Sequence, residues 1–214
     1  MSSKDLMYMN WQQMITPERV QVTSDGSYGK FVCEPLERGF GITIGNSLRR
    51  IILSSLYGAA ITAVKFDSVM HEFSVIPGVF EDVSEIILNL KSIRFKTKDA
   101  TPRVIRIAKK TEGPVTAADI VSDDGACEVL NPDLHIATLS PDGQLNMEMT
   151  VQVGKGYALS EQNKDEDASL GTIPIDAVFS PIKRVNYVVT NARVGQRTDY
   201  DKLTMEIWTD GSVK

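Results

Sequence analysis

The sequence predicts an α+β fold in which short strands outnumber helices. Two segments, residues 42–56 and 79–91, repeat their apolar side chains at the spacing of a helical face. Residues 145–153 instead alternate apolar and polar side chains, which is typical of a half-buried strand. The chain shows no regular strand–helix–strand alternation, so a parallel α/β sheet is not expected.

The first predicted elements are a strand and a helix joined by a glycine-rich turn. The strand covers residues 28–37, and the turn follows at residues 38–41. Gly39, Gly41 and Gly45 shape this turn into the helix, because their spacing and the absence of a Gly-Lys-Ser/Thr ending do not fit a phosphate-binding loop. The helix has an apolar stripe and a glycine stop at Gly58. The stripe consists of Ile44, Leu48, Ile51, Ile52, Ser55 and Leu56.

This helix carries a second apolar position away from its stripe. Leu53 shares a face with Arg49 and Arg50, which lie four and three residues before it. A helix that is apolar on more than one face is either deeply buried or bound to a partner, and arginine can pair with carboxylates at an interface. The residues alone leave burial within one domain and a subunit interface equally open.

The middle of the chain, from about Tyr57 to Phe179, is rich in predicted strands. Their ranges are 60–66, 93–96, 103–109, 134–139 and 145–153. The helix at residues 79–91 interrupts them, with Glu81 and Asp82 expected in its first turn and Lys91 near its end, as the helix dipole favours. Its apolar stripe is Phe80, Val83, Ile86, Ile87 and Leu90.

The last third begins with a predicted loop and ends in strands. Residues 154–171 form the loop, whose centre, Asp165, Glu166 and Asp167, is too polar to bury. Two strands follow at residues 184–189 and 202–208.

Composition excludes several classes of protein. A net charge of −5 argues against a domain whose main task is binding nucleic acid. No apolar run approaches the length of a membrane span, and the first residues lack the features of a signal peptide, so a cytoplasmic protein without a membrane is expected. The two cysteines, Cys33 and Cys127, are expected to be reduced.

No catalytic, cofactor or metal site is expected. The two histidines, His71 and His135, and the two cysteines lack metal-ligand spacing. His71 beside Glu72 resembles an acid–base pair, but no nucleophile motif accompanies it, and a role in a hairpin or an interface is favoured.

Five ordered blocks of the sequence resemble the alpha subunits of bacterial RNA polymerase. The strongest is residues 36–56, LERGFGITIGNSLRRIILSSL, which is similar to the family's signature helix nearly residue for residue. The others are VMHEFSVIPGVFED at 69–82, VSEIILNLK at 83–91, GPVTAADI at 113–120 and NARVGQRTDYDKL at 191–203. Chance similarity is negligible over so many ordered blocks.

The resemblance implies a homodimer that serves as the platform for the beta and beta-prime subunits. It places residues 40–56 at the two-fold interface and a family arginine needed for assembly with beta at Arg50. Dimer contacts are expected at Phe40, Ile44, Leu48, Ile51 and Ile52. Large-subunit contacts are expected at Arg49, Arg50, Leu53, His71, Glu72, Lys91, Arg193 and Arg197. Asp165, Glu166 and Asp167 are a hypothetical contact for transcription activators.

The resemblance also implies two subdomains. Residues 1–56 and 180–214 are expected to form a discontinuous dimerisation subdomain, with the strand-rich residues 57–179 inserted. The family's subunits continue with another helix, a linker and a carboxy-terminal domain that touches DNA and activators. Because this sequence stops at Lys214, we expect a truncated form without that domain, with a weaker dimer and no direct DNA binding.

Two other classes of function fit the sequence less well than an assembly subunit. A self-contained enzyme is disfavoured because no carboxylate pair, metal set or nucleophile–base constellation stands out. A DNA-binding module is disfavoured by the net charge and by the missing carboxy-terminal domain.

Overall fold

The computed structural model describes residues 15–213, apart from 18, 123–124 and 166–167. The fold is α+β, as predicted, and over these residues it consists mostly of strands with two α-helices. It divides into two compact units. Unit 1 combines the chain up to Leu53 with Ile182–Thr209, and unit 2 consists of Ser54–Pro181 with the residues from Asp210 on.

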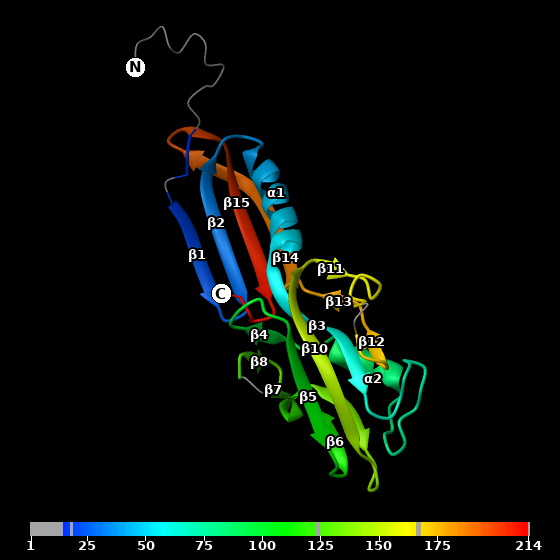
Figure 1. Ribbon diagram of the computed structural model, residues 1–214. Helices are drawn as coiled ribbons and strands as arrows, with labels where there is room; N and C mark the ends of the chain where they lie inside the picture. The colour runs from blue at the N-terminus through cyan, green and yellow to red at the C-terminus, as the bar shows by residue number, and fades with distance from the viewer. Residues whose placement is uncertain (1–14, 18, 123–124, 166–167, 214) are drawn as a thin grey trace. The chain divides into compact units, whose positions relative to one another are not determined.

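Unit 1 contains a four-stranded antiparallel sheet built from both ends of the chain (Figure 1). The strands are β1 (Arg19–Asp25), β2 (Tyr28–Leu36), β14 (Ile182–Val194) and β15 (Arg197–Thr209), and their order is β1-β2-β15-β14. β2 and β15 pair at the centre, with Phe31 opposite Met205. Segments more than 150 residues apart in sequence therefore lie side by side.

The two faces of this sheet differ in polarity because side chains alternate along each strand. Val22, Phe31, Met205 and Tyr187 are aligned across the four strands and share one face. The opposite face is polar. It carries the Tyr28 hydroxyl bonded to Glu206 at 2.7 Å, the Lys202–Glu34 ion pair at 3.0 Å and Arg184 stacked over Trp208.

Helix α1 (Phe40–Ser55) connects β2 to unit 2, and its bounds agree with the predicted helix. A turn at Gly39, whose φ is +87°, leads into it. Glycine adopts this left-handed conformation without a steric penalty, as the sequence predicted for the turn.

Unit 2 is organised around a seven-stranded sheet, counted over the described residues. Its path is β7-β5-β10-β3-β4-β8, with β12 also pairing with β3. The bounds are β3 Tyr57–Phe66, β4 Phe95–Thr97, β5 Arg103–Lys109, β7 Val121–Ser122, β8 Cys127–Val129, β10 Leu145–Lys155 and β12 Thr172–Pro174. Two smaller pairs complete it: β6 (Gly113–Thr116) with β9 (His135–Leu139), and β11 (Tyr157–Ala158) with β13 (Ala177–Val178). A 3₁₀ turn covers Ala117–Asp119.

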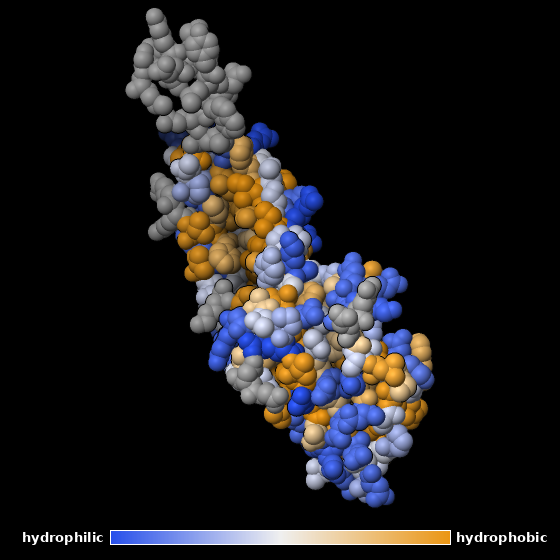
Figure 2. All heavy atoms as spheres, viewed as in Figure 1, coloured by the Kyte–Doolittle hydropathy of each residue, from blue (hydrophilic) through white to orange (hydrophobic). Residues whose placement is uncertain are grey.

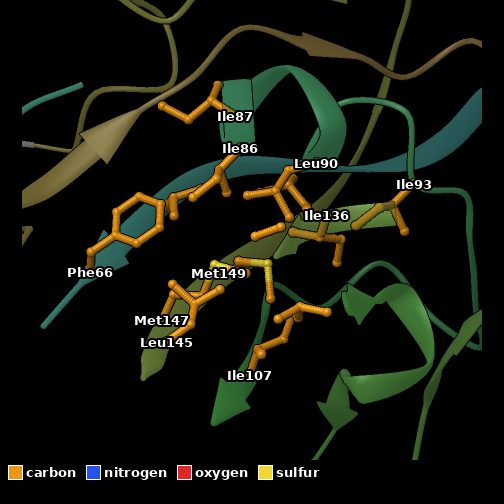
Figure 3. Close-up of a cluster of buried hydrophobic side chains, with 14 of the residues drawn as sticks. Phe66, Ile86, Ile87, Leu90, Ile93, Ile107, Ile136, Leu145, Met147 and Met149 are labelled. Atoms are coloured by element: carbon orange, nitrogen blue, oxygen red, sulfur yellow. The ribbon is translucent and has the colours of Figure 1, made fainter. Parts of the chain in front are cut away.

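The core of unit 2 lies between this sheet and helix α2 (Val83–Leu90). Figure 3 shows Ile86 and Leu90 of α2 directed toward Met147 and Met149 of β10. The predicted alternation of β10 is confirmed, because Leu145, Met147, Met149 and Val151 are all buried while the side chains between them are half-buried. Each fully buried side chain of this size contributes roughly 1.5–3 kcal/mol.

The second predicted helix is shorter than expected. α2 begins at Val83 rather than residue 79. After a turn at Pro77 and Gly78, whose φ is +80°, Val79 forms a β-bridge with Leu139 and the Phe80 amide bonds to the Thr138 carbonyl, so these residues pair with β9 instead of joining the helix. Asp82 is the N-cap, and its Oδ1 accepts a hydrogen bond from the Glu85 amide at 2.7 Å. Glu81 therefore lies outside the first turn. Phe80 was wrongly placed on the buried stripe and is 76% exposed.

Other boundaries also differ from prediction. The residues predicted as a loop at 154–171 include the end of β10 and strand β11. The predicted strand at 93–96 begins only at Phe95, because the amides of Ser92 and Ile93 bond to carbonyls of α2 and continue its last turn. β14 and β15 each have 13 residues and extend well beyond their predicted ranges.

Candidate interaction surfaces

Helix α1 is seated on the apolar face of the unit 1 sheet through two glycines. Gly41 and Gly45 are the buried residues of this helix, and they lie one turn apart on the same side. A Cβ atom on Gly45 would come within 2.7 Å of the Tyr187 ring and 3.0 Å of Leu203. One on Gly41 would come within 2.8 Å of Val189. The helix therefore approaches β14 and β15 as closely as its backbone permits.

The N-terminus of α1 is capped by a side chain from the far end of the sequence. Asp201 of β15 is 9% exposed, and its Oδ2 accepts hydrogen bonds from the Gly39 amide at 2.8 Å and the Gly41 amide at 3.0 Å. The first turn of α1 contains no acidic residue, so Asp201 supplies the negative charge that a helix N-terminus favours. This contact orients α1 on the sheet.

Because α1 contacts the sheet through its glycines, most of its large apolar side chains remain exposed. Phe40, Leu48 and Ile51, three of the predicted dimer contacts, are exposed, with Ile51 at 55%, and Ile44 and Ile52 are half-buried. Helical geometry places Phe40, Ile44 and Ile51 on one flank of α1. The structure therefore does not show the deep burial within one domain that the sequence left open.

The sheet beside α1 has an apolar surface as well. Figure 2 shows hydrophobic side chains gathered over β1, β2 and β15. Val20 and Val22 of β1 are more than half exposed, and Phe31 and Cys33 of β2 are partly exposed. A contiguous apolar surface of this kind marks an interaction site. We call the flank of α1 and these strand residues the apolar face of unit 1.

The opposite flank and the outer side of α1 carry the predicted large-subunit contacts. Arg49 and Arg50 are exposed, and Leu53 is 37% exposed. Helical spacing places Arg49 and Leu53 on the flank opposite Ile51. Arg50 lies next to them, closer to the side of the helix that faces away from the sheet. The helix thus presents an apolar flank and a cationic flank in different directions.

A second exposed surface comes from residues 67–82, which we call the 67–82 segment. Met70, Phe73, Val75 and Phe80 are all more than two-thirds exposed. The predicted contacts His71 and Glu72 belong to the same segment: His71 is hydrogen-bonded to Ser74 Oγ, and the Glu72 carbonyl accepts from Ser84 Oγ at 2.9 Å. Phe73 and Val75 were not among the contacts predicted residue by residue, although two large apolar side chains near the Pro77-Gly78 turn could have indicated them.

Lys91 is engaged within the chain rather than extended into solvent. It is the C-cap of α2 and forms an ion pair with Asp176, whose other carboxylate oxygen accepts a hydrogen bond from the Tyr157 hydroxyl at 2.8 Å. The hydrogen bond from Lys91 lowers the pKa of Asp176, and the bond to Asp176 raises the pKa of Tyr157. Through its two carboxylate oxygens, Asp176, which directly precedes β13, links the end of α2 to β11.

Arg193 and Arg197 lie at the turn between β14 and β15. Arg193 Nε donates to the Gly195 carbonyl at 2.8 Å, and Arg197 pairs with Asp199 at 3.0 Å while its guanidinium lies over the Tyr200 ring. Both side chains remain exposed. Of the hypothetical activator contacts, Asp165 is exposed, and Glu166 and Asp167 lie outside the described residues.

Within the described residues, no group of three or more histidine, cysteine or acidic side chains is arranged to hold a metal ion. Cys33 and Cys127 are free thiols whose pKa values are raised by burial. None of the helices in this part of the chain has both the length and the apolar character required to cross a membrane. The surfaces on α1 and the 67–82 segment are thus the strongest candidates for function.

Residues 64–180 match the family described as the RNA polymerase Rpb3/RpoA insert domain. The chain belongs to the family of RNA polymerase alpha subunits. It is 66% identical over 210 residues to the DNA-directed RNA polymerase subunit alpha of Desulfosudis oleivorans, covering 98% of this chain and 62% of that protein. It is 65% identical to the alpha subunit of Desulforapulum autotrophicum over 100% of this chain and 63% of the relative, and 60% identical to that of Geobacter metallireducens over 97% and 62%.

This alpha-subunit chain therefore spans a little over three fifths of the length of the relatives it matches. The predicted family is confirmed. The residue assignments for the dimer and the large subunits remain predictions.

Proposed function

We propose that this chain is the assembly platform of a bacterial DNA-directed RNA polymerase. Two copies associate, and the homodimer receives the beta and beta-prime subunits, which carry out nucleotidyl transfer during transcription in the cytoplasm. Family membership supports this role. The observation that carries it is the apolar face of unit 1, whose side chains are exposed among the residues that the structure describes.

Self-association is assigned to the apolar face of unit 1. A second copy would cover Phe40, Leu48 and Ile51 together with Val20 and Val22, all of which are exposed in the single chain. Removing this apolar surface from water is favourable in proportion to its area. In a two-fold dimer, the apolar face of one copy would contact the same face of the other copy, as a closed homodimer requires. Unit 1 corresponds closely to the proposed dimerisation subdomain, residues 1–56 and 180–214, with residues 57–179 as the insert.

The large subunits are assigned to the remaining surfaces. Arg49, Arg50 and Leu53 on the cationic flank of α1 are proposed to meet a large subunit, with Arg50 as the principal contact with beta. Residues 71–82 of the 67–82 segment, including His71 and Glu72, are proposed to face beta. Lys91, Arg193 and Arg197 are proposed as further large-subunit contacts, beta-prime included. Because both copies carry the same surfaces, beta and beta-prime would meet equivalent residues on different copies.

One further contact is proposed for the platform, and DNA binding is placed elsewhere. Asp165, Glu166 and Asp167 are a proposed contact for transcription activators. DNA contact is assigned to other parts of the polymerase, because the chain has a net charge of −5.

The dimer assignment can be tested with one charge placed on either flank of α1. Ile51→Asp introduces a carboxylate into the proposed interface and should shift the chain toward monomer in sedimentation velocity. Asn46→Asp adds the same charge on the opposite flank, where Asn46 is exposed, and should leave self-association unchanged. Equal behaviour of the two variants would contradict the assignment.

The large-subunit assignment can be tested by co-expressing the chain with the beta subunit of the same polymerase. Arg50→Ala should abolish or strongly reduce recovery of beta with the tagged chain, because a bidentate arginine contact would be lost. Thr43→Ala, on the same exposed side of the helix, is the matched control. Normal beta recovery with folded Arg50→Ala protein would show that this residue is not the principal contact.

A further inference from the structure

The 67–82 segment presents large apolar side chains without the support of regular structure. It runs from the end of β3 to the N-terminus of α2, and none of its residues belongs to an α-helix or a strand. Phe73 is 82% exposed. Ile76 and Val79 anchor the segment in the core of unit 2, but the exposed side chains beside them make no such contact. The direction of those exposed side chains therefore depends on the polar contacts that hold the backbone.

One carboxylate fastens the C-terminal end of this segment to β9. Glu81 Oε2 accepts a hydrogen bond from the Thr138 amide at 2.6 Å. Glu81 Oε1 lies 2.9 Å from Thr138 Oγ1 and 2.8 Å from His135 Nε2. His135 and Thr138 both belong to β9, so the Glu81 side chain contacts two residues of that strand. We call these contacts of Glu81 the Glu81 clamp.

The carboxylate of the clamp is mostly withdrawn from solvent, with 18% of the side chain exposed. Burial by itself would raise the pKa of Glu81. The hydrogen bonds from His135 and Thr138 outweigh this effect and hold that pKa below its usual range. Glu81 therefore remains an ionised acceptor at neutral pH, and hydrogen bonds to an ionised group are stronger than those between neutral groups.

Backbone contacts beside the clamp set the path of the chain. The Phe80 amide bonds to the Thr138 carbonyl at 3.1 Å, and the Ser140 amide bonds to the Gly78 carbonyl at 2.9 Å. On the α2 side of these backbone bonds, the Glu81 carboxylate accepts the hydrogen bond from the Thr138 amide. Loss of its carboxylate would leave the Thr138 amide without an acceptor at a half-buried position.

We propose that Glu81 is the positioning residue of the 67–82 segment: by clamping it to β9, Glu81 sets the direction in which Phe73, Val75 and Phe80 are offered to a large subunit. This inference rests on the proposed assembly function. Glu81 itself need not touch the partner. The clamp joins the proposed contact surface to the core of unit 2, since its neighbours Ile136, Ala137 and Leu139 on β9 are buried.

The test compares three variants of the full chain, each co-expressed with beta. Glu81→Ala removes the clamp and should reduce beta recovery by about ten-fold, the effect expected for losing hydrogen bonds to a buried charge. Glu81→Gln keeps an oxygen that can accept from the Thr138 amide and should restore most of that loss. Asn89→Ala is the control, because it removes another side-chain hydrogen bond to β9, from Asn89 Nδ2 to the Ile136 carbonyl at 3.0 Å, and lies outside the 67–82 segment.

Hydrogen exchange provides a readout that does not depend on a partner. In Glu81→Ala, the amides of Phe80 and Thr138 should exchange at least ten-fold faster, while those of the β10 core strand stay protected. The inference is overturned if Glu81→Ala binds beta as well as the unchanged chain does, or if Asn89→Ala weakens binding equally. Failure of the unchanged chain to bind beta would instead refute the proposed function, and unaltered exchange at Phe80 would refute the clamp itself.

Discussion

The close contact between the glycines of α1 and the sheet predicts how much stability a larger side chain at Gly45 would cost. Gly45→Val places a branched side chain where a Cβ alone would lie 2.7 Å from the Tyr187 ring and 3.0 Å from the buried Leu203. Overpacking of this kind costs about 1–3 kcal/mol, and two further methyl groups place this site toward the upper end. Valine regains only about 0.4 kcal/mol of helix propensity over glycine. The net loss should be about 2 kcal/mol.

Urea unfolding at one fixed chain concentration, followed by circular dichroism, measures this loss. For a slope of about 2 kcal/mol per molar urea, the unfolding midpoint should fall by about 1 M. Asn46→Val is the matched control, because it adds the same side chain at the next, exposed position of the helix and should change stability by less than about 0.5 kcal/mol. If both variants unfold at the same urea concentration, α1 is not seated through Gly45 and the reasoning fails.

Three further predictions concern the cap, the acid response and the core. Asp201→Ala should destabilise the chain by about 1–2 kcal/mol by removing the α1 cap, and Asp201→Asn, which keeps an acceptor oxygen, should lose less in thermal unfolding. The pKa values of Asp176 and Glu81 are lowered in the folded chain, so the unfolded chain binds more protons as the pH falls. The stability that these two carboxylates contribute is therefore present above about pH 4 and should decline below it. Unfolding midpoints measured from pH 7 to pH 3 should decline more gently in Asp176→Asn. Ile86→Ala, at a fully buried site, should cost about 2–5 kcal/mol by calorimetry, whereas Leu88→Ala on the exposed side of the same helix should cost less than about 1 kcal/mol.

The elements that the sequence predicted best are those whose periodicity extends over many residues. β10 alternates without interruption, and α1 has four turns of helical spacing, so both were located closely. The prediction of a helix at 79–91 is too long at its start because Phe80 matches the helical spacing, although Val79 and Phe80 pair with β9 instead. Periodicity describes which residues share a side and does not report where a backbone turns.

Features that depend on distant pairing could not be derived from the residues alone. Nothing local in β2 identifies β15 as its neighbour, and the cap that Asp201 provides to Gly39 and Gly41 joins residues 160 or more positions apart. The glycines were interpreted as residues that shape a turn, which holds for Gly39. Gly41 and Gly45 serve instead as a contact surface, and their four-residue spacing within a helix was the signal that could have shown it.

The pairing of β2 with β15 also has a consequence for the order of events during synthesis. Residues 54–181 of unit 2 are contiguous and can fold as soon as they leave the ribosome. Helix α1 is made earlier but has no β14 or β15 to rest on until the chain has been extended to Thr209. During that interval α1 lacks the sheet on which it packs and β2 lacks its central partner β15, so nascent chains are most exposed to aggregation, and to chaperones, before the last strand of the sheet is translated.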